Sequence, residues 1–152
     1  MKLQDFLKEE NIHLGLDCAD KQTFFRDALE ILKAQAWVSD PARVMEDLEM
    51  RESIMSTGVG LGVAIPHAQS DGVSRIHLSL WHPSRALDFN SVDKVPVDLI
   101  FMILGPREDS SEHVKILARI SRMLHREDFR TRIREASSSA EVLEIVRIFD
   151  DS

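Results

Sequence analysis

Residues 97–106 read Val97-Asp-Leu-Ile-Phe-Met-Ile-Leu-Gly-Pro106, a stretch that is nearly all apolar after Asp98. Its charge-free part is too short for a membrane-spanning helix, which needs about 20 residues. A short apolar run that ends at Gly-Pro is typical of a central strand with both faces covered. The stretch therefore predicts a buried strand at the centre of a sheet.

Further strands and several helices are expected on either side of this one. Val59–Ile65 is stopped by Pro66, Ile76–Trp81 alternates apolar with polar residues, and Ile12–Leu16 is a weaker strand candidate. Apolar periodicity and capping residues predict helices over Asp20–Trp37, Asp40–Glu52, Ser110–Leu124, Asp128–Glu135 and Ser138–Phe149. Because Ile76–Trp81 closely follows its neighbouring strand, we expect an α/β fold: a mixed β-sheet flanked by helices on both faces, in a single domain over residues 1–152.

The composition excludes several classes of protein. The formal net charge is −7, which argues against a clustered basic face for nucleic acid. Cys18 is the single cysteine, so neither an internal disulfide nor a cysteine-rich metal site is expected. The N-terminus lacks the long apolar core of a secretory signal. We therefore expect a cytoplasmic protein that binds no nucleic acid and does not insert into the membrane.

The segment before His67 is the most informative part of the sequence for function. Three glycines stand at every second position in Thr57–Gly62, which matches neither the dinucleotide signature nor a Walker A loop. Ile65-Pro66-His67 places an imidazole directly after the expected strand, beside backbone that can approach a ligand closely. Neutral imidazole is a nucleophile near physiological pH. The alternative is a structural histidine that bonds a loop carbonyl.

Two further residues are candidates for the same site. Arg51 lies in the helix that leads into the glycine segment, where it could clamp phosphoryl oxygens or be an ordinary solvated residue. His113 stands near the start of the helix after the central strand, where anions are favoured, or it could be a capping residue. Ligands of open α/β sheets usually bind at such carboxyl ends of strands.

Two motifs give the sequence a family resemblance. Arg51-Glu52 followed by Ser56–Ala68 resembles the phosphohistidine signature of type-2 EIIA domains of the bacterial sugar phosphotransferase system, in its fructose, mannitol and nitrogen-regulatory branch. Glu112–Leu117 resembles that family's second histidine motif, and Phe129-Arg130 with the closing helix also follows its pattern.

The resemblance implies a phosphotransferase component with a phosphohistidine intermediate. His67 would accept a phosphoryl group at Nε2 from a phosphocarrier protein, HPr or its nitrogen-branch counterpart, while Arg51 and His113 hold the phosphoryl oxygens. The group would pass to a cysteine of an EIIB domain, or remain as a signal read by a regulated kinase or transport protein. No cofactor and no metal are expected. Gln69 departs from the family, which often has Lys or Arg there, and this neutral side chain bears on the choice of carrier or the rate of transfer.

Several readings of function stay open at this point. The sequence includes no EIIB or EIIC segment, which slightly favours a nitrogen-type regulatory role over sugar transport. The alternative is a non-catalytic interaction module of the same fold. The sequence contains neither the G-x-S-x-G elbow of a serine hydrolase nor the H-E-x-x-H motif of a zinc enzyme, so these two classes carry little weight.

His13 and His77 alternate with apolar residues, so we expect both to face solvent or a rim.

Overall fold

The computed structural model describes residues 2–108 and 110–151, and within them one mixed sheet forms the centre of the fold. Its strands are β1 (Ile12–Leu14), β2 (Gly58–Gly60), β3 (Val63–Ala64), β4 (His67–Gln69), β5 (His77–His82) and β6 (Leu99–Gly105). The order across the sheet is β1-β5-β6-β3-β2, with β4 pairing with β6 beyond β3. The mixed sheet predicted from the sequence is confirmed.

Strand β6 lies at the middle of the sheet, as its apolar sequence predicts. It runs antiparallel to β5 and parallel to both β3 and β4, and all of its residues are buried. Leu99, Phe101 and Ile103 enter one hydrophobic core, whereas Ile100, Met102 and Leu104 enter the other. The alternation of side chains along one strand thus supplies both cores, and each such burial contributes about 1.5–3 kcal/mol.

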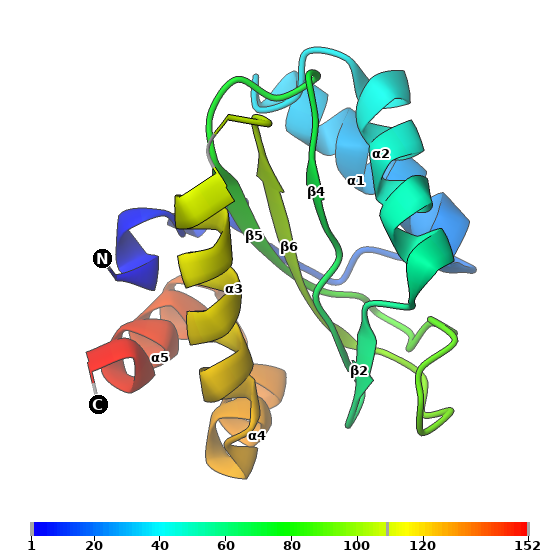
Figure 1. The fold of residues 1–152 in the computed structure, drawn as a ribbon. Coiled ribbons are helices and arrows are strands. Elements are labelled where there is room, and N and C mark those ends of the chain that lie inside the picture. The colour runs from blue at the N-terminus through cyan, green and yellow to red at the C-terminus, as the bar shows by residue number, and fades with distance from the viewer. Residues whose placement is uncertain (1, 109, 152) are drawn as a thin grey trace.

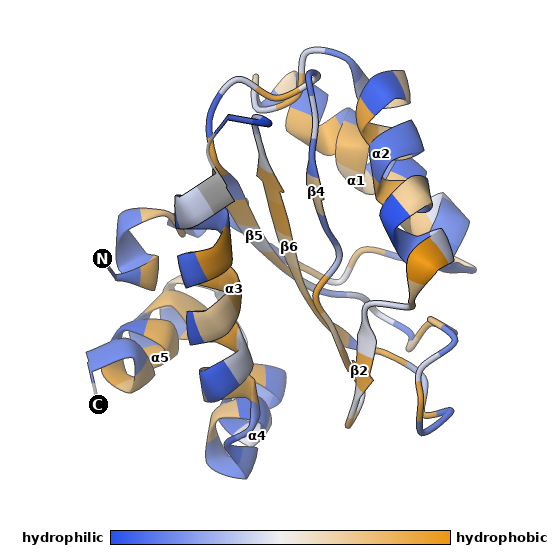
Figure 2. Cartoon of the chain, viewed as in Figure 1, coloured by the Kyte–Doolittle hydropathy of each residue, from blue (hydrophilic) through white to orange (hydrophobic). Residues whose placement is uncertain are grey.

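Helices cover both faces of the sheet (Figure 1). They are α1 (Lys21–Ala34), α2 (Pro41–Ile54), α3 (Ser110–Leu124), α4 (Glu127–Glu135) and α5 (Ser139–Asp151), with short 3-10 turns at Leu3–Asp5 and Glu9–Asn11. Helices α1 and α2 pack on one face, and α3, α4 and α5 pack on the other. Figure 2 shows apolar residues on β5, β6 and one side of the helices, in keeping with their amphipathic sequences.

The predicted starts of α1 and α2 are confirmed. The Asp20 carboxylate accepts a hydrogen bond from the Thr23 backbone N–H at 2.8 Å, and the Asp40 carboxylate accepts one from the Arg43 N–H at 3.2 Å. Pro41 occupies the first turn of α2, where its missing N–H costs nothing. No helix in the described part of the chain is long and apolar enough to cross a membrane.

The prediction of one strand over Val59–Ile65 is wrong, because this segment is a hairpin. β2 and β3 pair antiparallel, and the chain reverses at Leu61-Gly62. The φ angles of Gly60, Leu61 and Gly62 are 97°, 61° and 76°, so the backbone here is left-handed and cannot continue an extended strand. Two glycines at the turn allow this reversal.

The prediction that His77 faces solvent or a rim is also wrong. His77 is fully buried, and its ring packs against that of Trp37 with 4.7 Å between centroids. An alternating pattern predicts one exposed strand face, but helices cover β5 on both sides. His13 is half-buried and stacks on the buried ring of Trp81, at 3.9 Å between centroids.

Candidate functional site

His67 opens β4, a short strand that the sequence pattern does not reveal. Its Cα pairs with that of Ile103 in β6, and the Ile103 N–H donates to the Pro66 carbonyl at 3.0 Å. Because β4 and β6 are parallel, their carboxyl ends meet at one edge of the sheet. In Figure 1, β4 lies between α2 and α3.

An open cleft of ≈ 420 Å³ lies at this edge. Its lining residues come from α2, β4, the loop after β6, and α3: Asp47, Met50, Arg51, Ile54, His67, Ala68, Gln69, Arg107, His113, Val114 and Leu117. The structure therefore brings together the three site residues expected from the sequence, His67, Arg51 and His113.

The contacts of the His67 ring define its tautomer. Nδ1 lies 2.6 Å from the Ile65 carbonyl oxygen, which can only accept, so Nδ1 carries the proton. Nε2 lies 3.3 Å from the Arg51 Nε–H, which can only donate, so Nε2 bears a lone pair. This lone pair belongs to the nitrogen beside the arginine, and it is a nucleophile.

Burial lowers the pKa of His67 below the usual range, and the charge of Arg51 lowers it further. The hydrogen bond to the Ile65 carbonyl and the charge of Glu52 act in the opposite direction. The net lowering favours neutral imidazole, which is the form that can attack phosphorus.

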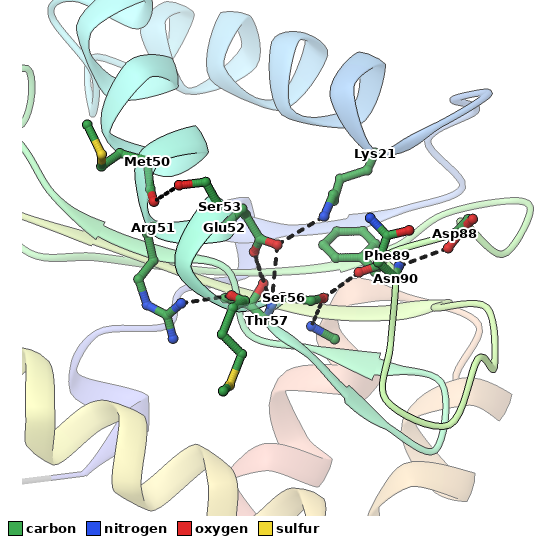
Figure 3. Close-up of polar contacts among 12 residues, drawn as sticks. Lys21, Met50, Arg51, Glu52, Ser53, Ser56, Thr57, Asp88, Phe89 and Asn90 are labelled. Atoms are coloured by element: carbon green, nitrogen blue, oxygen red, sulfur yellow. Dashed lines mark hydrogen bonds and ion pairs between the residues drawn. The ribbon is translucent and has the colours of Figure 1, made fainter.

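Arg51 is positioned by the end of α2, which is tied to the start of β2 (Figure 3). The Arg51 Nη1 donates to the Met55 carbonyl at 2.9 Å. The adjacent Glu52 forms an ion pair with Lys21 at 3.0 Å and accepts hydrogen bonds from the Thr57 N–H and hydroxyl. These contacts fix the last turn of the helix, and with it the guanidinium beside His67.

The glycine segment before His67 lies outside the lining of the cleft and is closely packed at Gly58. None of its glycines lines the His67 cleft. A Cβ at Gly58 would lie 2.4 Å from Ser91 Oγ and 3.1 Å from Phe89 Cβ. Glycine is therefore needed where β2 packs against the 88–93 loop.

His113 lies in the first turn of α3, close to the nucleophile. Its side chain is buried, and its ring centroid is 5.7 Å from that of His67. A Cβ at Gly105 would lie 3.6 Å from His113 Nδ1, so the imidazole rests against the carboxyl end of β6. Both imidazoles therefore line the same part of the cleft as Arg51.

Of two further polar lining residues, Gln69 was noted from the sequence as a departure from the family, whereas Arg107 was not identified. Gln69 lies at the end of β4, and its Nε2 is buried without a hydrogen-bond partner. Arg107 follows Gly105-Pro106, and its guanidinium contacts the carboxylates of Asp47 at 3.2 Å and Asp71 at 3.3 Å. Its place just beyond the carboxyl end of the central strand was the available signal.

The lining residues suit an anionic group better than a metal ion. In the described part of the chain, no group of three or more His, Cys, Asp or Glu side chains could hold a metal. The cleft combines a nucleophilic nitrogen with two guanidinium groups, a second imidazole and the Asp47 carboxylate, which is paired with Arg107. Such groups stabilise the oxygens of a transferring phosphoryl group.

Comparison with known proteins gives a consistent result. The family model described as "Phosphoenolpyruvate-dependent sugar phosphotransferase system, EIIA 2" matches residues 5–148. The fructose-specific EIIA component of Haloferax volcanii is 34% identical over 137 residues, which are 90% of this chain and 89% of that protein. The nitrogen regulatory protein of Pseudomonas aeruginosa is 37% identical over 107 residues, 70% of each chain.

A longer relative and a solved structure complete the comparison. The fructose-specific EIIABC component of Bacillus subtilis is 29% identical over 99% of this chain, which spans only 24% of that protein's length. The crystal structure of nitrogen regulatory protein IIA-Ntr from Neisseria meningitidis has a TM-score of 0.87 and 30% identity, covering 95% of this chain and 98% of that one.

Proposed function

The chain belongs to the EIIA 2 family of the phosphoenolpyruvate-dependent sugar phosphotransferase system, and from this premise we propose that it carries a phosphoryl group on Nε2 of His67. The observation that supports this most strongly is the tautomer of His67, with its lone pair on the nitrogen beside Arg51. A phosphohistidine carrier protein, HPr or its nitrogen-branch counterpart, is the proposed donor.

The chemical step is an exchange of one N–P bond for another. The N–P bond of the donor phosphohistidine breaks and its electron pair returns to the donor nitrogen, while the Nε2 lone pair forms the new bond to phosphorus. The His67 ring keeps its Nδ1 proton and becomes positively charged. The Ile65 carbonyl, 2.6 Å from Nδ1, stabilises that charge.

Arg51 and His113 are the proposed contacts of the phosphoryl oxygens. The Arg51 Nε–H points at Nε2 before transfer, so it can turn to the oxygens once phosphorus occupies that position. The His113 ring lies 5.7 Å from the His67 ring, a spacing that leaves room for oxygens between them. Fixed donors of this kind stabilise charge without reorganisation during the reaction.

The phosphoryl group then passes to a cysteine of an EIIB domain or acts as a regulatory signal in the cytoplasm. The relatives carry both sugar-specific and nitrogen-regulatory names. A nitrogen-type role is slightly favoured, in keeping with the similarity to IIA-Ntr over nearly the whole length of both chains. The second candidate is an interaction module that regulates a partner without phosphotransfer.

The test is transfer from a phosphorylated HPr-type carrier. The wild type should acquire an acid-labile, base-stable phosphate, and His67→Ala should acquire none. His125→Ala is the control, because this exposed histidine lies outside the cleft and should leave labelling unchanged. Labelling of His67→Ala at another histidine would refute the assignment, and an unlabelled wild type, tested with HPr and with its nitrogen-branch counterpart, would favour the interaction module.

A further inference from the structure

The cleft contains two arginines, Arg51 and Arg107, which differ in their present contacts. Arg51 is bonded to His67, while Arg107 enters the cleft from the loop after β6. Gln69, beside the nucleophile on β4, brings an amide and no charge to the same cleft. Arg107 is thus a second cation of the cleft, and its guanidinium reaches the Asp47 carboxylate on α2.

The backbone that holds Arg107 is tied to the strand of His67. Gly105, two residues before Arg107, pairs with Gln69, and its carbonyl accepts the Ser70 N–H at 2.9 Å. Because Gln69 is two residues after His67, the start of this loop and the nucleophile sit on one hydrogen-bonded ladder. The backbone from which the Arg107 side chain extends is therefore held close to the strand of His67.

The guanidinium itself is held by contacts that a stronger anion can replace. Arg107 reaches Asp47 at 3.2 Å and Asp71 at 3.3 Å, and its side chain is half-exposed. Arg43 lies 3.5 Å from Asp47 and 3.8 Å from Asp71, so both carboxylates keep a cationic partner if Arg107 leaves. The Asp71 carboxylate is exposed, so its pair with Arg107 is weak, whereas a phosphoryl group offers two charges and suits a bidentate arginine contact.

Resting on the proposed function, we infer that Arg107 is a second guanidinium contact of the phosphoryl group on His67. When His67 is phosphorylated, Arg107 leaves Asp47 and Asp71 and binds the phosphoryl oxygens, and Arg43 retains the two carboxylates. Arg107 thereby supplies the positive charge that Gln69 lacks. Phosphorylation also changes the surface around Asp71, which a partner can read.

The matched variants are Arg107→Gln and Arg43→Gln, because both arginines contact the same two carboxylates but only Arg107 lines the cleft. With a phosphorylated HPr-type carrier as donor, Arg107→Gln should slow phosphorylation by about tenfold or more. Arg43→Gln should slow it clearly less than Arg107→Gln, because Arg43 lies outside the cleft and acts only on the two carboxylates. Equal slowing of both variants, or a wild-type rate for Arg107→Gln, would overturn the inference.

Two further readouts separate a charge contact from a structural role. The Nε–H resonance of Arg107 should shift on phosphorylation, and an unchanged resonance would contradict the inference. Adding Gln69→Lys to Arg107→Gln should restore most of the lost rate, since it returns one positive charge to the cleft. A double variant as slow as Arg107→Gln would count against charge substitution. Failure of the proposed function looks different, because the wild type itself would then carry no label.

Discussion

At the scale of single residues, the proposed chemistry depends on two contacts that fix the protons of one ring. The Ile65 carbonyl holds the proton on Nδ1 of His67, and the Arg51 Nε–H points at Nε2. The first contact places a proton on Nδ1, and the second requires a lone pair on Nε2, so the ring is neutral. Together they present a neutral nucleophile toward the cleft. The first contact comes from the backbone next to Pro66, and the second comes from the end of α2.

The pH dependence of transfer follows from the lowered pKa of His67. The neutral ring reacts, so acceptance should decline as pH falls through a pKa below the ordinary value of about 6.5. Arg51→Gln removes a charge that lowers this pKa, so the pKa should rise and the acid limb should move to higher pH. NMR titration of the His67 ring and transfer rates from pH 5 to 8 measure both shifts. An Arg51→Gln protein with the wild-type pKa would disprove this coupling.

The sequence predicted part of this site well. His67, Arg51 and His113 were identified from their motifs and from the ends of expected elements, and the structure brings them to one cleft. Arg107 was not, because nothing in the linear sequence shows that it reaches Asp47 of a helix 60 residues earlier. Pairings between distant charged residues are set by the tertiary fold, and they cannot be inferred from a single sequence.

At the scale of elements, the hairpin β2–β3 shows why boundaries were harder to predict than element types. The five apolar residues and two glycines of Val59–Ile65 read as one short strand, but the positive φ angles at Gly60 and Gly62 reverse the chain. Strand β4 was missed because its three residues, His67–Gln69, are too few for a periodic pattern. The longer elements, with caps and clear periodicity, were predicted within a few residues.

Gly62 should be the least replaceable glycine of this hairpin turn. Its φ is 76°, and a Cβ there would lie 2.6 Å from Arg134 Nη2, which itself donates to the Leu61 carbonyl at 2.7 Å. Gly62→Ala should therefore lower the free energy of unfolding by about 1–3 kcal/mol. Gly15→Ala is the control, since Gly15 has a φ of 88° but open space around it. Urea unfolding should show the larger loss for Gly62→Ala, and equal losses would mean that the Arg134 contact has no effect.

At the scale of the whole molecule, two helical layers turn the central strands into a fully covered sheet. The apolar run of Leu99–Gly105 was enough to predict this for β6, because it has no polar face. The alternating pattern of β5 gave the wrong burial for His77, since alternation does not reveal a helical layer that covers a polar residue. The same layering places α2 and α3 on either side of the cleft.

Burial of His77 should make the whole fold sensitive to acid. Burial, with smaller effects from the charges of His13 and Arg75, lowers the pKa of His77 to about 3. The unfolded chain binds this proton near pH 6.5 and the folded chain does not, so stability is complete above that pH and is lost as pH falls toward 3. The slope should reach about 1.4 kcal/mol per pH unit. Denaturant unfolding of His77→Leu should show a shallower slope than wild type, with the exposed His125→Ala as control; equal slopes would contradict the assignment.

The most direct test of the central claim is NMR of the phosphorylated protein with ¹⁵N-labelled histidines. The account predicts a single phosphorylated ring, with ³¹P coupled to Nε2 of His67 and the proton retained on Nδ1 against the Ile65 carbonyl. Phosphorus on Nδ1 of His67, or on His113, would contradict it.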